Sequence, residues 1–317
     1  MAGLSGQFRL EMVVTKNWRG WSIRSGIRST FVAAVTSAVQ ADRLAWAFFS
    51  GYQAAIQATF PTRCIPGEVS AICVNEVGRK ISEITTQLRI GNGFFHLEGK
   101  KSWSLAGVDE LTMFVLARNK DGPERGPGSL SFLQLPKSTA GVKMNPPKEQ
   151  EPVPELPHAE VEFSNVIVAS AQIIPGDGYA DFAKPFRLSE DIHVTACTLA
   201  YLLGEGRNAN WSKIWIQKCI AAISGLYSCS TLDPLRAETH ILTAGVLNLA
   251  GEVIYESEYL WGQSAKEKSK RWHRDFPLLS LGREARRQRA IKSWRTIGWT
   301  VSDHFGLGDH ISGGFVV

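Results

Sequence analysis

The chain has 317 residues, of which 44% are hydrophobic and 21% charged, and its formal net charge is +5 at pH 7. This is the composition of an ordinary globular protein, with length for one large domain or two to three small ones. No run approaches the roughly 20 apolar residues that span a bilayer, so the sequence predicts a soluble protein without a membrane span. The weakly basic charge permits a polyanionic partner but does not require one.

The five cysteines and seven histidines are scattered along the chain. No CxxC pair occurs, and no histidine stands near a cysteine at metal-ligand spacing, which argues against a zinc site and against a disulfide scaffold. We therefore expect no structural metal and a reducing compartment, the cytoplasm.

The N-terminal part of the chain contains a basic leader and a helical pattern. Residues 1–30 carry five Lys or Arg and one acid, Glu11; this loosely suits an organelle transit peptide, although a frayed leader is the simpler interpretation. Residues 30–60 then repeat apolar side chains at three- and four-residue spacing up to Pro61, which predicts a helix. We assign residues 1–61 to a short N-terminal helical segment.

Residues 62–180 change to β-branched residues, alternation and glycine-bearing turns, which predicts a mainly antiparallel barrel or sandwich between 62 and 175. Gly91-Asn92-Gly93 joins ITTQLRI to FFHLEG and predicts a hairpin rather than a nucleotide-binding loop, because the third Rossmann glycine is absent. In HAEVEFSNVIV, Glu160 and Glu162 alternate with apolar residues, so we expect a solvated strand face rather than an acid/base pair. The proline-dense residues 144–157 predict an extended surface loop.

The helical period returns at Asp191 and predicts helices over 191–298 within a C-terminal helical bundle, residues 181–317. The first of these helices, DIHVTACTLAYLLGEG, is expected to close at Gly204 and Gly206. Further segments are predicted over 236–261 and 282–298. The fold class is therefore α+β: helical segment, β middle domain, helical bundle.

Three strings give this arrangement a family resemblance. ICVNEVGRKISEITTQLR, GNGFFHLEGKKSWSLAGVDELTMFVLAR and HAEVEFSNVIVASAQIIPGDGYADF occur in that order and resemble the middle domain of the acyl-CoA dehydrogenase superfamily. The resemblance covers residues 70–205 well and the flanking helices loosely, as in a divergent, shortened member. It implies FAD as cofactor, an acyl-CoA or related acyl substrate, a role in lipid metabolism, and a homo-oligomer formed through the C-terminal helices.

The resemblance also implies site residues. In the family the first two strings lie along the flavin, and a tryptophan covers its ring; an isoalloxazine needs such an aromatic wall and a few donors. The implied cofactor-binding residues are Cys73, Val74, Asn75, Trp103, Ser104, Leu105 and Arg236. Trp103 matches the family tryptophan and is expected to line a cleft between the β domain and the C-terminal helices, whereas the plainer alternative is that it plugs the barrel end.

Several family positions are altered. Asn75 replaces a threonine but keeps its hydrogen-bonding ability, and Leu105 replaces another threonine, so a hydroxyl toward the flavin is lost. Ser82 is the implied substrate contact, one residue after the usual serine position, and Arg236 is the basic candidate for the FAD pyrophosphate.

The family's catalytic base is a glutamate, for which Glu284 is the available carboxylate. Its position beside Gly282 is more typical of an acid that stabilises the first turn of a helix. The altered positions together predict weak or lost dehydrogenase activity.

Two other functions remain open. A flavin-dependent monooxygenase of the same fold needs no such base. A non-catalytic, nucleic-acid-binding homologue is suggested by residues 264–298, which contain eleven Lys or Arg, three acids, and the interleaved Trp272 and Trp294. A solvated basic face, or one that meets the phosphates of CoA or FAD, is the plainer interpretation of that segment.

Overall fold

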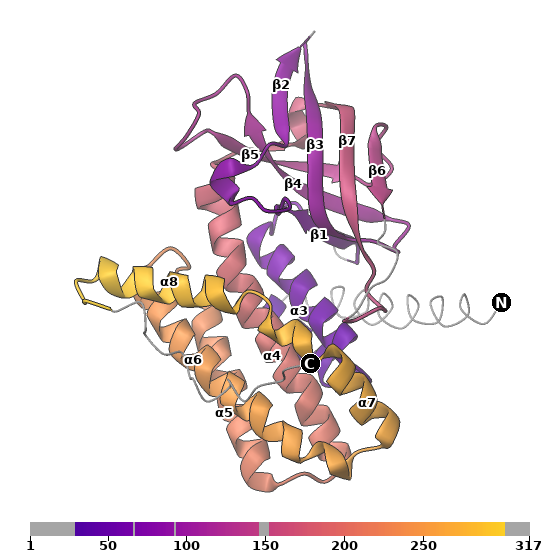
Figure 1. The fold of residues 1–317 in the computed structure, drawn as a ribbon, viewed down its shortest axis with the longest axis vertical. Helices are drawn as coiled ribbons and strands as arrows, with labels where there is room; N and C mark the ends of the chain where they lie inside the picture. The colour runs from indigo at the N-terminus through magenta and orange to yellow at the C-terminus, as the bar shows by residue number, and fades with distance from the viewer. Residues whose placement is uncertain (1–28, 66, 92, 146–151, 302–317) are drawn as a thin grey trace, which may run out of the picture. The chain divides into compact units, whose positions relative to one another are not determined.

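The computed structural model describes residues 29–65, 67–91, 93–145 and 152–301, which fall into two compact units. The strand unit contains Gln53–Arg187; the helical unit contains Phe31–Tyr52 and the helices from Leu188 onward (Figure 1). The basic leader, Asn92 and part of the proline-dense loop lie outside the described residues. The domain limits 1–61, 62–180 and 181–317 stay a prediction.

The strand unit is built on one eight-stranded sheet in the order β6-β7-β3-β2-β4-β5-β8, with β1 paired to β4. Five strand pairs are antiparallel, while β1–β4 and β2–β4 are parallel. The prediction of a mainly antiparallel sheet is confirmed. The two parallel pairs were not predicted, because alternation of apolar and polar residues indicates a strand but not the strand that it pairs with. The strands are β1 Val69–Cys73, β2 Gln87–Gly91, β3 Phe94–Leu105, β4 Leu111–Asn119, β5 Leu130–Pro136, β6 Val142–Asn145, β7 His158–Val168 and β8 Ile173–Ile174.

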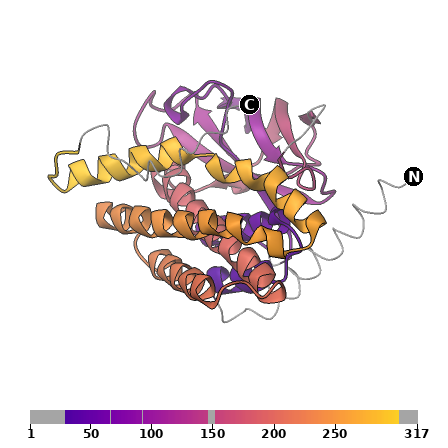
Figure 2. The same cartoon turned by 60° about the horizontal axis from the view of Figure 1, so that its bottom comes forward.

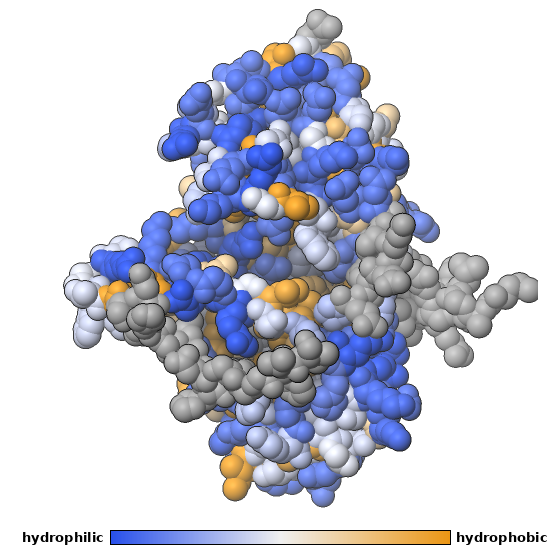
Figure 3. All heavy atoms as spheres, viewed as in Figure 1, coloured by the Kyte–Doolittle hydropathy of each residue, from blue (hydrophilic) through white to orange (hydrophobic). Residues whose placement is uncertain are grey.

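Two local predictions within this sheet are confirmed. Gly91 pairs with Phe94 across the β2–β3 hairpin, and Gly93 has the positive φ of 81° that such a turn requires. On β7, Glu160 and Glu162 both lie within ion-pair distance of Lys100, at 3.7 and 3.6 Å, and their side chains are partly exposed. They therefore belong to the solvated face of the strand. Hydrophilic side chains cover much of the strand unit on the face shown in Figure 3.

Helices form where the 3.6-residue period predicted them, between 191 and 298. α5 lies against α6, and α6 against α8 (Figures 1 and 2). The helices are α2 Thr30–Ala38, α3 Leu44–Thr59, α4 Lys184–Asn208, α5 Lys213–Ser230, α6 Ala237–Glu256, α7 Lys266–Asp275 and α8 Arg283–Thr296. Short turns η1 Ile81–Glu83, η2 Ser170–Gln172, η3 Gly178–Ala183, η4 Ser257–Tyr259, η5 Trp261–Gln263 and η6 Phe276–Ser280 complete the described elements.

Two helix limits differ from the prediction. The predicted helix 30–60 is broken after Ala38, and α4 continues through Gly204 and Gly206 instead of closing there. A Cβ at Gly204 would lie 2.3 Å from the carbonyl oxygen of Val39, and one at Gly206 would lie 3.0 Å from Trp211. These glycines permit close approach of backbone and indole inside the unit; they are not helix stops.

An aromatic cluster forms part of the core of the helical unit. Trp261 stacks on Trp272 with ring centroids 5.2 Å apart and meets Trp211 edge-on at 5.4 Å, and all three are almost fully buried. Trp272 is therefore a core residue, which is a correction to its suggested role beside a nucleic acid. None of the described helices is long and apolar enough to cross a bilayer.

Candidate functional site

The two family-like motifs meet in the strand unit. The backbone N–H of Ser102 donates to the carbonyl oxygen of Asn75 over 2.9 Å, and Lys101 Nζ donates to the carbonyl oxygen of Val74 over 3.2 Å. The β3–β7 pairing shifts register between Lys101 and Ser104, so Ser102 and Trp103 lie on a bulge. A bulge redirects side chains from the regular sheet, and such irregularities are common beside functional sites.

A buried ion pair also joins the two motifs, and we call the place where they meet the motif junction. Glu76 Oε1 accepts from Lys101 Nζ over 2.9 Å, and the Lys101 side chain is fully buried. The backbone N–H and hydroxyl groups of Thr85 and Thr86 also donate to the carboxylate, at 2.7 to 2.9 Å. The sequence analysis missed this network. Side chains alternate between the two faces of a strand, so Lys101 lies on the same face of β3 as the buried Leu97. A lysine on a buried face indicates a buried acidic partner.

The electrostatics of the pair follow from burial and hydrogen bonding. Burial alone would raise the pKa of Glu76, but the donors of Thr85 and Thr86 and the charge of Lys101 outweigh it and lower that pKa to about 2. Burial lowers the pKa of Lys101, and Glu76 offsets this only in part. The carboxylate is therefore fixed in its charged form and serves structure rather than proton transfer.

Two candidate flavin residues lie at the surface of the junction. Trp103 is 60% exposed and meets His158 edge-on at 5.8 Å, so it does not plug the barrel end. Asn75 is also exposed, and its Oδ1 accepts from Arg187 Nη2 over 2.7 Å. Beside Trp103, the hydroxyl of Ser102 is buried without a hydrogen-bond partner among the described residues. The junction thus presents an aromatic face and a carboxamide at its surface, and the Ser102 hydroxyl is buried beside them.

The other four strand-unit candidates are buried: Cys73, Val74, Ser104 and Leu105. Burial raises the pKa of the Cys73 thiol to about 11, although a hydrogen bond from Ser104 and the charge of Lys101 oppose this. The side chains of these four residues pack inside the unit, so a role toward a cofactor falls to their backbone groups and stays a prediction.

The implied substrate contact, Ser82, is exposed in η1, and its carbonyl oxygen accepts from Arg118 Nη2 over 2.8 Å. It lies in the same unit as the motif junction. No described contact joins its side chain to Asn75 or Trp103. Its role also stays a prediction.

The remaining two candidates belong to the helical unit and are engaged with neighbours in sequence. Arg236 is exposed and pairs with Glu238 at 3.1 Å. Glu284 in α8 accepts from Arg287 and Gln288, at 2.9 and 2.7 Å, and these hydrogen bonds lower its pKa to about 2. A carboxylate that weakly basic is a poor proton acceptor.

The basic segment 264–298 is largely used for internal ion pairs. Six of its eleven cations contact acids of the helical unit within 4.0 Å: Lys268, Lys270, Arg274, Arg286, Arg287 and Arg289. Charges neutralised in this way contribute little to phosphate binding. The arrangement does not support the nucleic-acid alternative.

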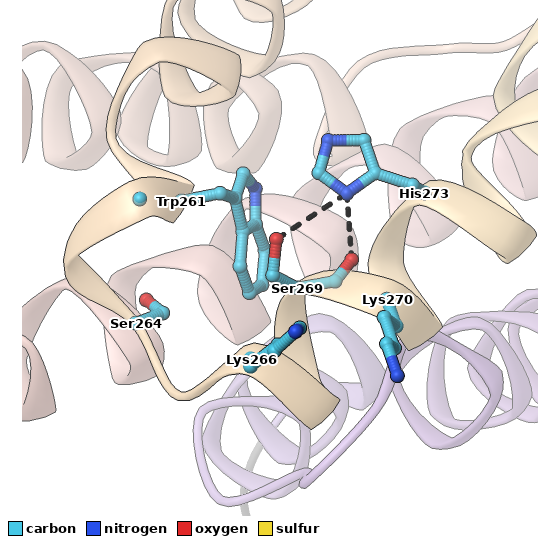
Figure 4. A pocket seen from close by; sticks show the side chains of 7 residues that line it. Trp261, Ser264, Lys266, Ser269, Lys270 and His273 are labelled. Carbon is cyan, nitrogen blue, oxygen red and sulfur yellow. Dashed lines mark hydrogen bonds between the residues drawn. The ribbon is translucent and has the colours of Figure 1, made fainter.

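A pocket of about 450 Å³ lies between η5 and the start of α7 in the helical unit (Figure 4). Lys266, Lys270 and His273 line it, together with Ser264 and Trp261. The Ser264 hydroxyl and the Trp261 indole N–H are buried and have no hydrogen-bond partner among the described residues. Lys266 and the N-terminus of α7 give this pocket a positive character, whereas Lys270 pairs with Glu267 at 3.3 Å. Within the described ranges, no group of three His, Cys, Asp or Glu could hold a metal ion.

Comparison with known proteins supports the fold through structure alone. No protein-family model matches the sequence, and no curated protein matches it. Among solved structures, butyryl-CoA dehydrogenase from Megasphaera elsdenii is 14% identical with a TM-score of 0.64, covering 91% of this chain and 89% of that one. The prolyl acyl carrier protein oxidase AnaB is 15% identical with a TM-score of 0.66, covering 92% and 91%.

FMN-bound TdsC from Paenibacillus sp. A11-2 is 12% identical with a TM-score of 0.62, covering 92% of this chain and 98% of that one. Identities this low establish architecture and leave activity to be argued from the site. The helix–sheet–helix order predicted from the change of hydrophobic period along the chain is confirmed, and the chain has the fold of the acyl-CoA dehydrogenases.

Proposed function

We propose that the chain is an FAD-dependent oxidoreductase that acts on an acyl-CoA or a related acyl substrate. The observation that carries this proposal is the junction of the two motifs, where Trp103 is exposed on the bulge of β3 and Asn75 is exposed beside it. A flat ring system needs an apolar wall and directed hydrogen-bonding groups, and the exposed Trp103 and Asn75 fit that requirement. Bound FAD would supply the two-electron redox chemistry.

Each group has a separate task in this arrangement. The indole of Trp103 covers one face of the ring and keeps water from it. The Asn75 carboxamide orients the ring edge. The Glu76–Lys101 pair holds the two motif backbones together, so that neither group moves when a ligand binds.

Replacing Trp103 by Ala is expected to weaken FAD binding about 5-fold to 150-fold, because stacking on an aromatic side chain contributes roughly 1–3 kcal/mol per ring. The measurement is titration of the flavin-free protein with FAD, followed by absorbance and fluorescence. Trp299→Ala is the matched control, since Trp299 is 63% exposed and lies in the helical unit. Equal loss in both variants, or none in Trp103→Ala, would contradict the proposed ring site.

A second enzymatic function is favoured by one observation. Glu284 is exposed, paired with Arg287 and weakly basic, which suits a reaction that needs no carboxylate base. A flavin-dependent monooxygenase of this fold catalyses such a reaction. Oxygen uptake by the reduced protein, coupled to product formation, would distinguish it from dehydrogenation.

A homo-oligomer formed through the helical unit is the third element of the proposal. Large apolar side chains are exposed on α5 and α6, and exposed apolar groups of this density mark interaction surfaces. They are Ile214, Ile220, Tyr227, Leu242 and Leu249. Light scattering should therefore give a mass of two or four chains, whereas the mass of one chain would contradict the assignment.

A further inference from the structure

Arg187 donates a hydrogen bond to the side chain of Asn75, a candidate flavin residue. Among the described residues of the strand unit, no other cation makes such a contact with a candidate side chain. Arg187 lies in the first turn of α4, directly after η3, and its Nη2 donates to Asn75 Oδ1 over 2.7 Å. No carboxylate of the described residues lies within ion-pair distance of it. Its charge is therefore not neutralised by a neighbour and acts on the surface that carries Asn75.

This contact fixes the orientation of the Asn75 carboxamide. A guanidinium group has five N–H donors and no acceptor, so the amide atom that faces it is the oxygen. The amide nitrogen then points away from Arg187 and offers two donors at the exposed edge of the junction. The Ser102 hydroxyl, buried and unpartnered, lies on the adjacent bulge. The exposed polar group beside Trp103, the Asn75 amide nitrogen, is thereby set to donate.

A surface of donors and one positive charge recognises an electron-rich edge, and it does so more strongly as that edge gains negative charge. A flavin gains negative charge at its pyrimidine edge on reduction. An opposite charge within about 4–6 Å typically favours the charged form of a group by one to three pKa units, which is tenfold or more. The same charge–charge preference applies to the two redox states of a bound ring.

We propose that Arg187 is a positioning residue of the flavin site: it fixes Asn75 as a hydrogen-bond donor and favours the reduced over the oxidised flavin. This inference rests on the proposed function, because it requires a flavin at the Trp103–Asn75 junction. It also assigns Asn75 a definite role, donation to the ring edge, where a threonine of the related proteins would both donate and accept.

The test uses the full-length protein loaded with FAD and measures two quantities: the FAD dissociation constant and the midpoint potential of the bound flavin against a reference dye. Arg187→Met is expected to lower the affinity for reduced relative to oxidised flavin about tenfold. For a two-electron couple this corresponds to a fall of about 30 mV in potential. Arg187→Lys keeps the charge and should retain most of the wild-type potential.

Arg89→Met is the matched control, because Arg89 is a half-exposed arginine of the same unit and pairs with Glu98 at 4.0 Å. It should leave the potential unchanged. Wild-type protein that binds no FAD would refute the proposed function and this inference together. FAD binding with an unchanged potential in Arg187→Met would refute the inference alone, as would an equal shift in Arg89→Met. A purely structural arginine would change thermal stability without moving the potential.

Discussion

Glu76→Gln is expected to lower the free energy of unfolding by about 3–5 kcal/mol, because it leaves the Lys101 ammonium buried without its counter-ion. Lys101 is fully buried, and its other hydrogen-bond acceptor is the Val74 carbonyl oxygen. The loss is a large part of the roughly 5–15 kcal/mol that stabilises an ordinary domain. Urea titration of wild type and variant, followed by circular dichroism, measures the difference.

Two further variants separate the ion pair from general sensitivity of the fold. Glu252→Gln removes an exposed acid of α6 and should change the free energy of unfolding by less than about 0.5 kcal/mol. The double variant Glu76→Gln/Lys101→Met removes both charges and should recover much of the loss, as replaced buried pairs often do. A small effect of Glu76→Gln alone would show that Lys101 finds another partner or loses its proton.

The same pair predicts a pH dependence. The pKa of Glu76 is lowered from 4.5 to about 2 in the folded protein, so its contribution to stability is complete above pH 4.5 and is lost as the pH falls toward 2. The difference in unfolding free energy between wild type and Glu76→Gln should shrink over that window. A difference that stays constant between about pH 6 and pH 2.5 would contradict the assigned pKa.

The sequence predicted which segments are helices or strands better than it predicted which residues meet across the fold. The strand predicted from alternation in HAEVEFSNVIV and the helices predicted from the period after Asp191 are both confirmed. Each pattern arises within one short segment that buries a single face, so it can be read from the local sequence. The Glu76–Lys101 pair joins residues 25 positions apart, and Gly204 approaches Val39, which lies far from it in the chain. In the sequence, such long-range contacts are indicated only indirectly, by a lysine on the buried face of a strand or by a glycine inside a helix.

The candidate site shows the same division. The motif strings named Trp103 and Asn75 as candidates toward one cofactor; the backbones of Asn75 and Ser102 are hydrogen-bonded, and the role of the two side chains stays a prediction. They did not disclose Arg187, because it lies beyond the strings in the chain and meets Asn75 only in the folded unit. They also did not disclose the pocket at α7, whose defining property is two buried donors without partners among the described residues. Satisfaction of hydrogen bonds is a property of the fold and not of the local sequence.

Acyl-CoA dehydrogenation by this protein is expected to be slow and unaffected by Glu284→Gln. Removal of a thioester α-proton needs a positioned base of suitable pKa, and its absence typically reduces the rate by about 10²–10⁴. Glu284 is held by Arg287 and Gln288, and its pKa of about 2 makes it a weak acceptor. Anaerobic stopped-flow mixing of the FAD-loaded protein with acyl-CoA esters of varied chain length measures the rate from flavin absorbance.

Two variants make this result decisive. Glu267→Gln removes another exposed acid of the helical unit and serves as the control. Arg287→Met frees Glu284 from its main hydrogen-bond donor, so its pKa should rise; if Glu284 is nevertheless the base, the rate should rise with it. Rapid bleaching of the wild-type flavin that disappears in Glu284→Gln alone would establish Glu284 as the base. Rapid bleaching in every variant would place the base on a different residue, and slow bleaching in all of them would leave a reaction that requires no carboxylate as the better description of this site.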